Sequence, residues 1–180
     1  EWSLGYDDLA ALNPSLIYAS LTAYGEQGPE RDREGFDLVA HWSRSGMMGL
    51  VRTEDAPPSP CLPGMGDHPT GVSLYAAIVT AVVRRLKTGE GSHVHTSLLA
   101  NGLWSASCVA QAAFVGADFS HYYRARKNVF TRFVYQTADE RWLQFSMVRT
   151  DAEVAGLLAV LSHEALLEDE RFATLESRFA

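Results

Sequence analysis

The residues of this sequence best placed for chemistry lie where a loop rich in glycine and proline runs into a long apolar segment. Residues 57–66 contain four prolines and two glycines, and Asp67 follows them directly. A carboxylate at such a junction can accept backbone N–H groups as a helix N-cap, with Pro69 suited to the first turn. The same carboxylate, beside glycines that let a ligand approach the backbone closely, can instead act as a nucleophile. The residues alone leave both roles of Asp67 open, and the two roles are compatible.

The sequence offers little for other kinds of catalytic machinery. His93 and His95 share one face of a predicted strand and the remaining histidines are scattered, so the spacing of a metal-ligand set is missing. The strained Gly-x-Ser-x-Gly turn of a serine hydrolase is missing too, as are the glycine patterns that bind phosphates and dinucleotides. We therefore expect no metal site and no permanently bound cofactor.

Composition and charge narrow the class of protein. With 47% hydrophobic and 21% charged residues, a chain of 180 residues can bury one good core and fold. A formal net charge of −7 argues against nucleic acid and anionic lipid as partners. The two cysteines are too few for a disulfide framework, and no run of apolar residues is long enough for a membrane span. We expect a cytoplasmic protein that binds neither nucleic acid nor membrane.

Local patterns in the sequence predict an ordered series of strands and helices. Up to about residue 100 we expect a short helix capped by Asp7 or Asp8, a strand over 15–22, a helical segment within 36–50, a loop over 51–66, a helix over 69–86 and a strand over 92–99. Later patterns indicate a helix over 98–117, a hairpin turning at 138–140 and further helices from Asp151. Strands alternating with helices favour an α/β body with a mainly parallel sheet, followed by an α+β part.

Four segments of the sequence resemble the family III CoA-transferases, also called the CaiB/BaiF group, which includes formyl-CoA transferase, carnitine CoA-transferase and α-methylacyl-CoA racemase. In chain order they are NPSLIYASLTAYGEQGP, GFDLVAHWSRSGMMGL, GMGDHPTGVSLYAAIVTAVVRRLKTGEGSHVHTSLL and YQTADERWLQFSM. The most specific element is Gly66-Asp67, followed by Gly71, an apolar helix and a Thr-Gly-Glu-Gly turn at 88–91. The similarity spans nearly the whole chain.

The resemblance implies a covalent CoA-transferase mechanism with Asp67 as the catalytic residue. In the family, the aspartate at this position attacks an acyl-CoA thioester and passes through an aspartyl anhydride and an aspartyl-CoA thioester before a carboxylic acid acceptor takes the CoA. Coenzyme A thioester is thus a substrate, not a resident cofactor. Gly64 and Gly66 would let the thioester approach, and Phe36 and Asp37 would complete the substrate-binding set.

Two residues of this set have alternative roles. At Phe36 the racemase branch has a proton-transferring histidine, and a phenyl ring cannot move a proton, so this residue favours a transferase over a racemase. Phe36 can also be a core aromatic. Asp37 can be a helix N-cap or a polar neighbour of the catalytic loop.

The resemblance also implies an architecture. The expected parts are a partial Rossmann-like large domain over 1–100 with a parallel sheet and the catalytic loop, a connecting helix over 101–128, and the start of a small α+β domain over 129–180. Family chains are longer and form interlocked homodimers, so we expect a partial chain. The competing hypotheses are a racemase-like enzyme of the same fold, and a non-catalytic fragment or assembly module in which Asp67 only caps a helix.

Overall fold

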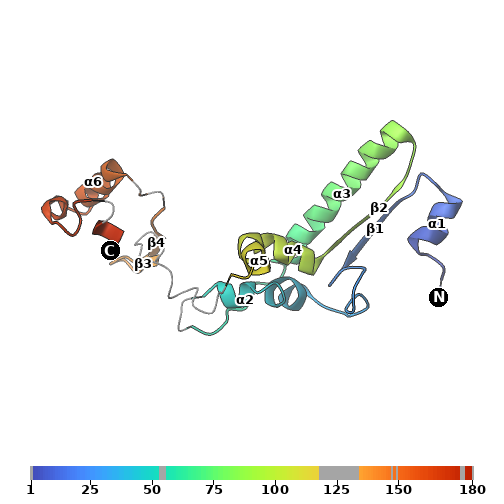
Figure 1. Ribbon diagram of the computed structural model, residues 1–180, viewed down its shortest axis with the longest axis horizontal. Helices are drawn as coiled ribbons and strands as arrows, with labels where there is room; N and C mark the ends of the chain where they lie inside the picture. Colours follow the sequence, from blue (N-terminus) through green and yellow to red (C-terminus); the bar gives the residue numbers. More distant parts are fainter. Residues whose placement is uncertain are drawn as a thin grey trace. The chain divides into compact units, whose positions relative to one another are not determined.

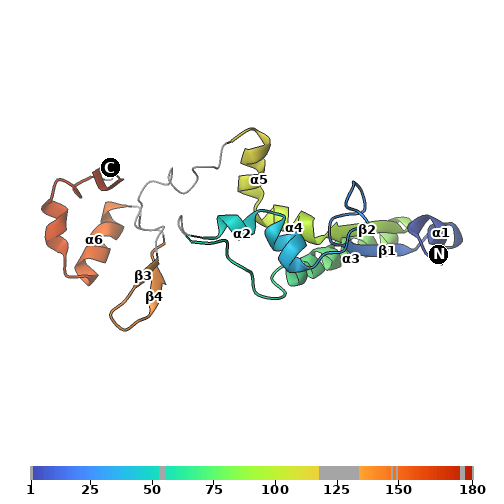
Figure 2. The same cartoon turned by 90° about the horizontal axis from the view of Figure 1, so that it is seen from below.

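The computed structural model describes residues 2–52, 56–117, 134–146, 148, 150–174 and 177–179 (Figure 1). Its first part is built on two parallel strands, β1 (Ile17–Thr22) and β2 (Ser92–Ser97), in register from Ile17 opposite Ser92 to Thr22 opposite Ser97. The long helix α3 (Asp67–Thr88) is the last element of the crossover between them and packs along the strand pair, as Figures 1 and 2 both show. The α/β class with parallel strands is therefore confirmed.

Shorter helices complete this part of the chain. They are α1 (Tyr6–Leu12), the π-helix η1 (Asp37–Ser43), α2 (Met47–Leu50), α4 (Leu98–Ser105) and α5 (Ser107–Phe114). Helix α4 packs against η1, so a segment that follows β2 meets one that follows β1. This contact lies beside the start of α3, because both η1 and α4 also approach that corner.

Several helix boundaries differ from the sequence prediction. The segment 36–50 is divided into η1 and α2, because Gly46 adopts a left-handed backbone with φ +88° that interrupts a helix. The helix expected over 98–117 divides at Ala106 into α4 and α5. Helix α1 has Gly5 at its N-cap, so the predicted cap at Asp7 or Asp8 is wrong; the Asp8 carboxylate instead accepts the Gly5 N–H, at 3.3 Å.

The start of α3 bears directly on the role of Asp67. Gly66, not Asp67, occupies the N-cap position, and its carbonyl accepts both the N–H and the hydroxyl of Thr70, at 3.1 and 2.6 Å. Asp67 is the first residue of the helix, and no side-chain cap hydrogen bond is present. The prediction that Asp67 serves as the N-cap is therefore wrong, because the backbone turns helical one residue earlier.

A small apolar core holds the loop that precedes Asp67. Trp42, Met47 and Ala106 are buried together, and Met48 and Cys61 pack against them. The indole N–H of Trp42 donates to the Ser59 carbonyl, with 2.6 Å between nitrogen and oxygen. This hydrogen bond ties the proline-rich loop to η1, so the loop reaches α3 along a fixed path.

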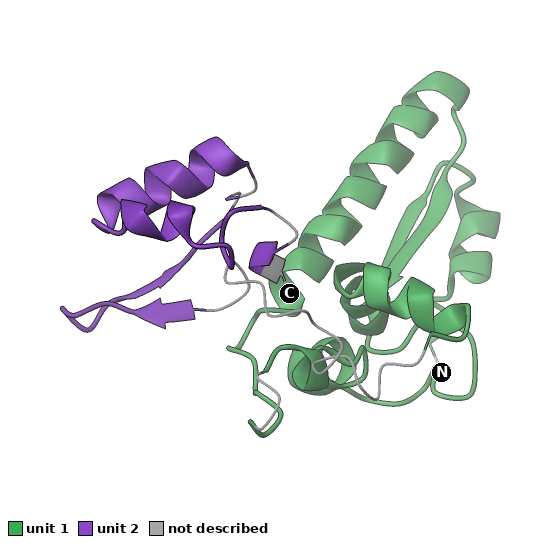
Figure 3. Cartoon of the chain, turned by 60° about the vertical axis from the view of Figure 1, so that its left-hand side comes forward, with its two compact units in different colours: residues 1–119 green, residues 120–180 purple. Residues whose placement is uncertain are grey.

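The chain divides into two compact units, Glu1–Phe119 and Ser120–Ala180 (Figure 3). The second unit contains the hairpin of β3 (Val134–Gln136) and β4 (Trp142–Gln144), which are antiparallel, and the helix α6 (Asp151–Val160). Two 3₁₀ helices, η3 (Glu164–Glu168) and η4 (Ser177–Phe179), follow. The predicted hairpin and the helix beginning at Asp151 are confirmed. The predicted domain boundary at residue 128 lies outside the described residues.

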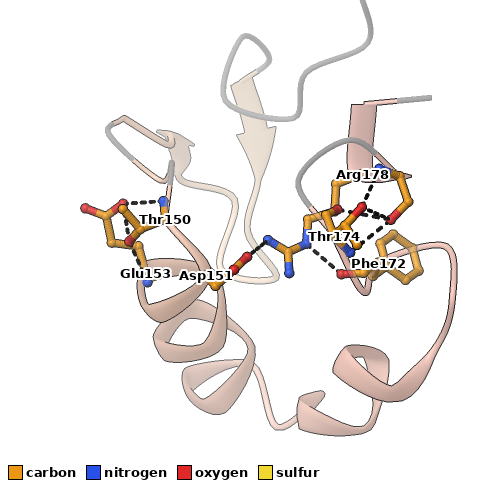
Figure 4. Close-up of polar contacts among 7 residues, drawn as sticks. Thr150, Asp151, Glu153, Phe172, Thr174 and Arg178 are labelled. Carbon is orange, nitrogen blue, oxygen red and sulfur yellow. Dashed lines mark hydrogen bonds and ion pairs between the residues drawn. The ribbon is translucent and has the colours of Figure 1, made fainter.

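Polar contacts near α6 hold the second unit together (Figure 4). Thr150 and Glu153 form a capping box, in which the Thr150 N–H donates to Glu153 Oε2 at 2.8 Å and the Glu153 N–H donates to Thr150 Oγ1 at 3.3 Å. Arg178 Nη1 pairs with Asp151 Oδ1 at 2.6 Å, and Arg178 Nε donates to the Phe172 carbonyl at 2.6 Å. Arg178 thus joins the last described segment to the first turn of α6.

Within the described ranges, no helix combines the length and the apolar character needed to cross a membrane.

Candidate active site

Asp67 lies exposed at the amino end of the 22-residue helix α3. Among the described residues, no hydrogen-bond donor is paired with its carboxylate. The first N–H groups of a helix lack partners within it and give its amino end a partial positive charge, which favours a bound anion. The side chain is therefore an accessible carboxylate in an electrostatically favourable place, free to meet a ligand.

The Asp37 carboxylate binds the loop that precedes Asp67. It is the first residue of η1, only 8% exposed, and its Oδ2 accepts the Gly64 N–H at 2.7 Å while Oδ1 accepts the Leu38 N–H at 2.7 Å. Phe36 occupies the N-cap position of η1. Of the two roles considered for Asp37, the structure thus gives it that of a polar neighbour of the loop.

Gly64 and Gly66 allow the backbone of the loop to turn and to pack closely against η1. Gly64 adopts φ +83°, a left-handed conformation that favours glycine. At Gly66, an added Cβ would lie 2.5 Å from the His41 Cβ and 2.8 Å from the Asp37 Cβ, so no side chain fits. The missing side chain at Gly66 allows η1 to pack directly against the corner where the loop becomes α3.

His41 is a third polar side chain at this corner, and the sequence analysis placed it only among the scattered histidines. It is 3% exposed, and neither ring nitrogen has a hydrogen-bond partner within the described part of the chain. Each unpaired buried polar atom costs about 1–3 kcal/mol. Burial lowers the pKa of His41, and the Asp37 and Asp67 carboxylates oppose that shift in part, so the ring is neutral near pH 7. The signal in the sequence that could have singled out His41 was its spacing of four residues from Asp37.

Phe36 does not join this cluster. Its side chain is 80% exposed, so the expectation of a core aromatic is wrong for the described part of the chain. The structure brings Asp37, Gly64, Gly66 and Asp67 together through direct contacts or adjacency, and leaves Phe36 at the start of η1 with its ring in solvent.

Other reactive groups in the first unit have different surroundings. Burial, followed by the nearby Asp37 carboxylate, raises the pKa of the Cys61 thiol, which keeps it protonated and weakly nucleophilic. His93 and His95 both approach Glu26, with 3.2 Å from His93 Nε2 to Oε1 and 4.0 Å from His95 Nδ1 to Oε2. Across the parts of the chain that the structure describes, no group of three or more His, Cys, Asp or Glu residues is placed to hold a metal ion.

Comparison with known proteins identifies the family. The family model for CoA-transferase family III matches residues 1–180. The chain belongs to this family. The family III chain is 28% identical over 177 residues to (R)-2-hydroxy-4-methylpentanoate CoA-transferase of Clostridioides difficile, covering 98% of this chain and 44% of that protein. It is 31% identical over 176 residues to cinnamoyl-CoA:phenyllactate CoA-transferase of Clostridium sporogenes, covering 97% of this chain and 43% of that protein.

Solved structures agree with this assignment. The family III chain resembles Rv3272 from M. tuberculosis with a TM-score of 0.79 and 27% identity, over 98% of this chain and 45% of that one. It resembles a CaiB/BaiF family protein from Brucella suis with a TM-score of 0.70 and 26% identity, over 98% of this chain and 46% of that one. The chain thus spans less than half the length of these relatives.

Proposed function

We propose that the protein is an acyl-CoA:carboxylate CoA-transferase in which Asp67 is the covalent nucleophile. The observation that carries the proposal is an exposed carboxylate at the amino end of α3, without a hydrogen-bond donor among the described residues, in a chain of family III. The C. difficile and C. sporogenes relatives are named as CoA-transferases, and their names differ in the acids they use. The proposal therefore specifies the reaction class and leaves the two acids open.

The reaction balances without a metal or a proton donor. An Asp67 oxygen attacks the thioester carbonyl, so that a C–O bond forms, the C–S bond breaks and CoA leaves as the thiolate. The thiolate then attacks the Asp67 carbonyl carbon of the mixed anhydride and releases the donor acid, which leaves an aspartyl-CoA thioester. The acceptor carboxylate attacks that thioester, which releases the thiolate and forms a second mixed anhydride. The thiolate then attacks the acceptor acyl carbon of this anhydride, so that a C–S bond forms, the C–O bond breaks and the Asp67 carboxylate is released. Covalent catalysis divides one difficult exchange into these acyl transfers.

The surrounding residues support separate roles in this scheme. The partial positive charge at the amino end of α3 is suited to stabilise the oxyanion that forms at each attack. Asp37, Gly64 and Gly66 shape the loop, and Phe36 offers an exposed apolar surface to the acyl-CoA. A racemase would need a proton-transferring group, which the phenyl ring of Phe36 cannot supply. We also propose a homodimer with interlocked chains and a cytoplasmic location, both carried over from the family.

The Asp67→Asn variant tests the function. In the full encoded protein, incubation with acyl-CoA and trapping with hydroxylamine should modify the wild-type peptide that contains Asp67 and leave the variant peptide unmodified. The free energy of unfolding should fall by no more than about 1 kcal/mol, because the variant loses only the interaction of the charge with the helix amino end. Peptide mass spectrometry and urea unfolding measure the two outcomes.

Asp7→Asn is the matched control, because Asp7 is also an exposed carboxylate in the first turn of a helix. It should keep the wild-type adduct. An equal adduct in Asp67→Asn, or none in wild type, would contradict the proposal and favour a non-catalytic module.

A further inference from the structure

The His41 imidazole is a buried polar group that has no role in the reaction proposed above. A neutral imidazole carries one N–H donor and one acceptor nitrogen, and both ring nitrogens of His41 are buried from solvent with no partner among the residues that the structure describes. Buried side-chain polar atoms are nearly always hydrogen-bonded, so an unpaired ring calls for an explanation.

The position of the ring restricts what it can serve. Gly66 lies against the Cβ and Cγ of His41 from the start of α3, and Gly102 of α4 lies against the His41 carbonyl. The residue is fixed between two helices, and the residue after Gly66 is Asp67. The carboxylates that act on the ring are Asp37 from its own element and Asp67 from α3.

Of these two carboxylates, Asp67 is the better acceptor for the imidazole N–H. Both oxygens of Asp37 already accept a backbone N–H, from Leu38 and from Gly64. Asp67 has no such donor among the described residues, and its exposed side chain can change rotamer freely, whereas the buried ring cannot. Among the described residues, the His41 N–H thus lacks an acceptor, and the Asp67 carboxylate, one residue after the glycine that packs on His41, lacks a donor.

We propose that the Asp67 side chain turns inward and accepts an N–H from the His41 imidazole, which makes His41 a positioning residue for the nucleophile. The hydrogen bond holds one carboxylate oxygen and directs the other toward the thioester carbonyl. This role rests on the proposed function of Asp67, whereas the contact itself can be tested without turnover.

Kinetics of two variants in the full encoded protein test the role. His41→Leu keeps a similar volume without polar atoms, and His41→Gln keeps a side-chain N–H. His41→Leu should lower kcat for CoA transfer by about tenfold to a hundredfold, the range expected for one hydrogen bond to a charged group, with KM for acyl-CoA little changed. His41→Gln should recover much of the loss, and His163→Leu, at an exposed histidine of the second unit, should behave as wild type.

A purely structural His41 predicts the opposite result. Replacing an unpaired buried ring by leucine would then leave kcat within twofold of wild type, and that outcome would overturn the positioning role.

An NMR measurement tests the contact by itself. With ¹⁵N-labelled histidine, Asp67→Ala should shift the imidazole signals of His41, assigned through their loss in His41→Gln, whereas Asp7→Asn should not. Unchanged His41 signals in Asp67→Ala would refute the contact whatever the kinetics show. A shift in a protein that transfers no CoA would instead refute the proposed function and leave the contact standing.

Discussion

At the scale of single residues, the candidate site is a set of three ionisable side chains in contrasting surroundings. Asp37 is buried and accepts two backbone N–H groups, His41 is buried with no partner in the described ranges, and Asp67 is exposed at the amino end of α3. Burial with partners suits a structural carboxylate, because each of its oxygens accepts a hydrogen bond. Exposure suits a nucleophile, because a substrate can reach the carboxylate oxygens.

The buried ring has a consequence for stability against pH. Burial lowers the pKa of His41 from its ordinary value of 6.5. Below pH 6.5 the unfolded chain therefore binds a proton at this histidine that the folded chain takes up only at lower pH. The contribution of the neutral His41 to the free energy of unfolding is thus complete above pH 6.5 and is lost as the pH falls. The slope for one proton is at most about 1.4 kcal/mol per pH unit. Urea unfolding at several pH values should give a shallower acid decline for His41→Leu than for wild type.

His163→Leu serves as the control for this measurement and should retain the wild-type decline, since that side chain is exposed. Identical slopes for wild type and His41→Leu would show that His41 does not resist protonation in the folded chain.

At the scale of elements, the site depends on how closely η1 approaches the corner before α3. The approach is possible because Gly66 has no side chain, and the loop is held on either side by the Trp42 and Asp37 hydrogen bonds. Helix α4 closes the same region, since a Cβ at Gly102 would lie 2.3 Å from the His41 carbonyl oxygen. The corner is thus a tightly packed junction that presents one exposed carboxylate.

Two glycine-to-alanine variants separate packing from helix propensity. Gly66→Ala should destabilise the protein by about 1–3 kcal/mol, because its methyl group must displace His41 or Asp37. Gly71→Ala, on the exposed face of α3 with no atom within 4 Å of its Cβ, should stabilise it by about 1 kcal/mol through helix propensity. Thermal unfolding followed by circular dichroism measures both, and a neutral Gly66→Ala would argue against the tight corner.

At the scale of the whole chain, the described residues bury few large apolar side chains and expose many. One group forms a stripe along α3 at helical spacing, composed of Val72, Tyr75, Val79, Val83 and Leu86 with exposed fractions of 66, 67, 42, 46 and 80%. Contiguous apolar surface of this kind is uncommon on a monomer and usually meets another surface.

The 180-residue chain should therefore bind the dye ANS. Replacing Val79 and Val83 together by glutamine should lower the dye fluorescence and reduce self-association, because the substitutions divide the stripe. Val160→Gln is the control, since Val160 is 83% exposed but lies on α6, outside the stripe. Fluorescence titration and sedimentation velocity measure the result, and equal dye binding by the double variant and wild type would count against the stripe as the binding surface.

The sequence by itself determined the elements whose patterns are local. The strands near 15–22 and 92–99, the long helix before Gly89 and the hairpin at 138–140 all follow from apolar periodicity and turn residues, which depend on near neighbours. It also singled out Asp67, because the Gly-Asp junction and its flanking segments resemble family III.

Only the tertiary structure decided how the side chains at that junction are used. Gly66, rather than Asp67, occupies the N-cap position, and Phe36 lies in solvent. Asp37 accepts the Gly64 N–H, and His41 is buried without a partner among the described residues. Each of these outcomes depends on contacts between segments distant in the chain, namely η1, the proline-rich loop, α3 and α4. Local sequence carries no record of such contacts, because burial and pairing are properties of the packed fold.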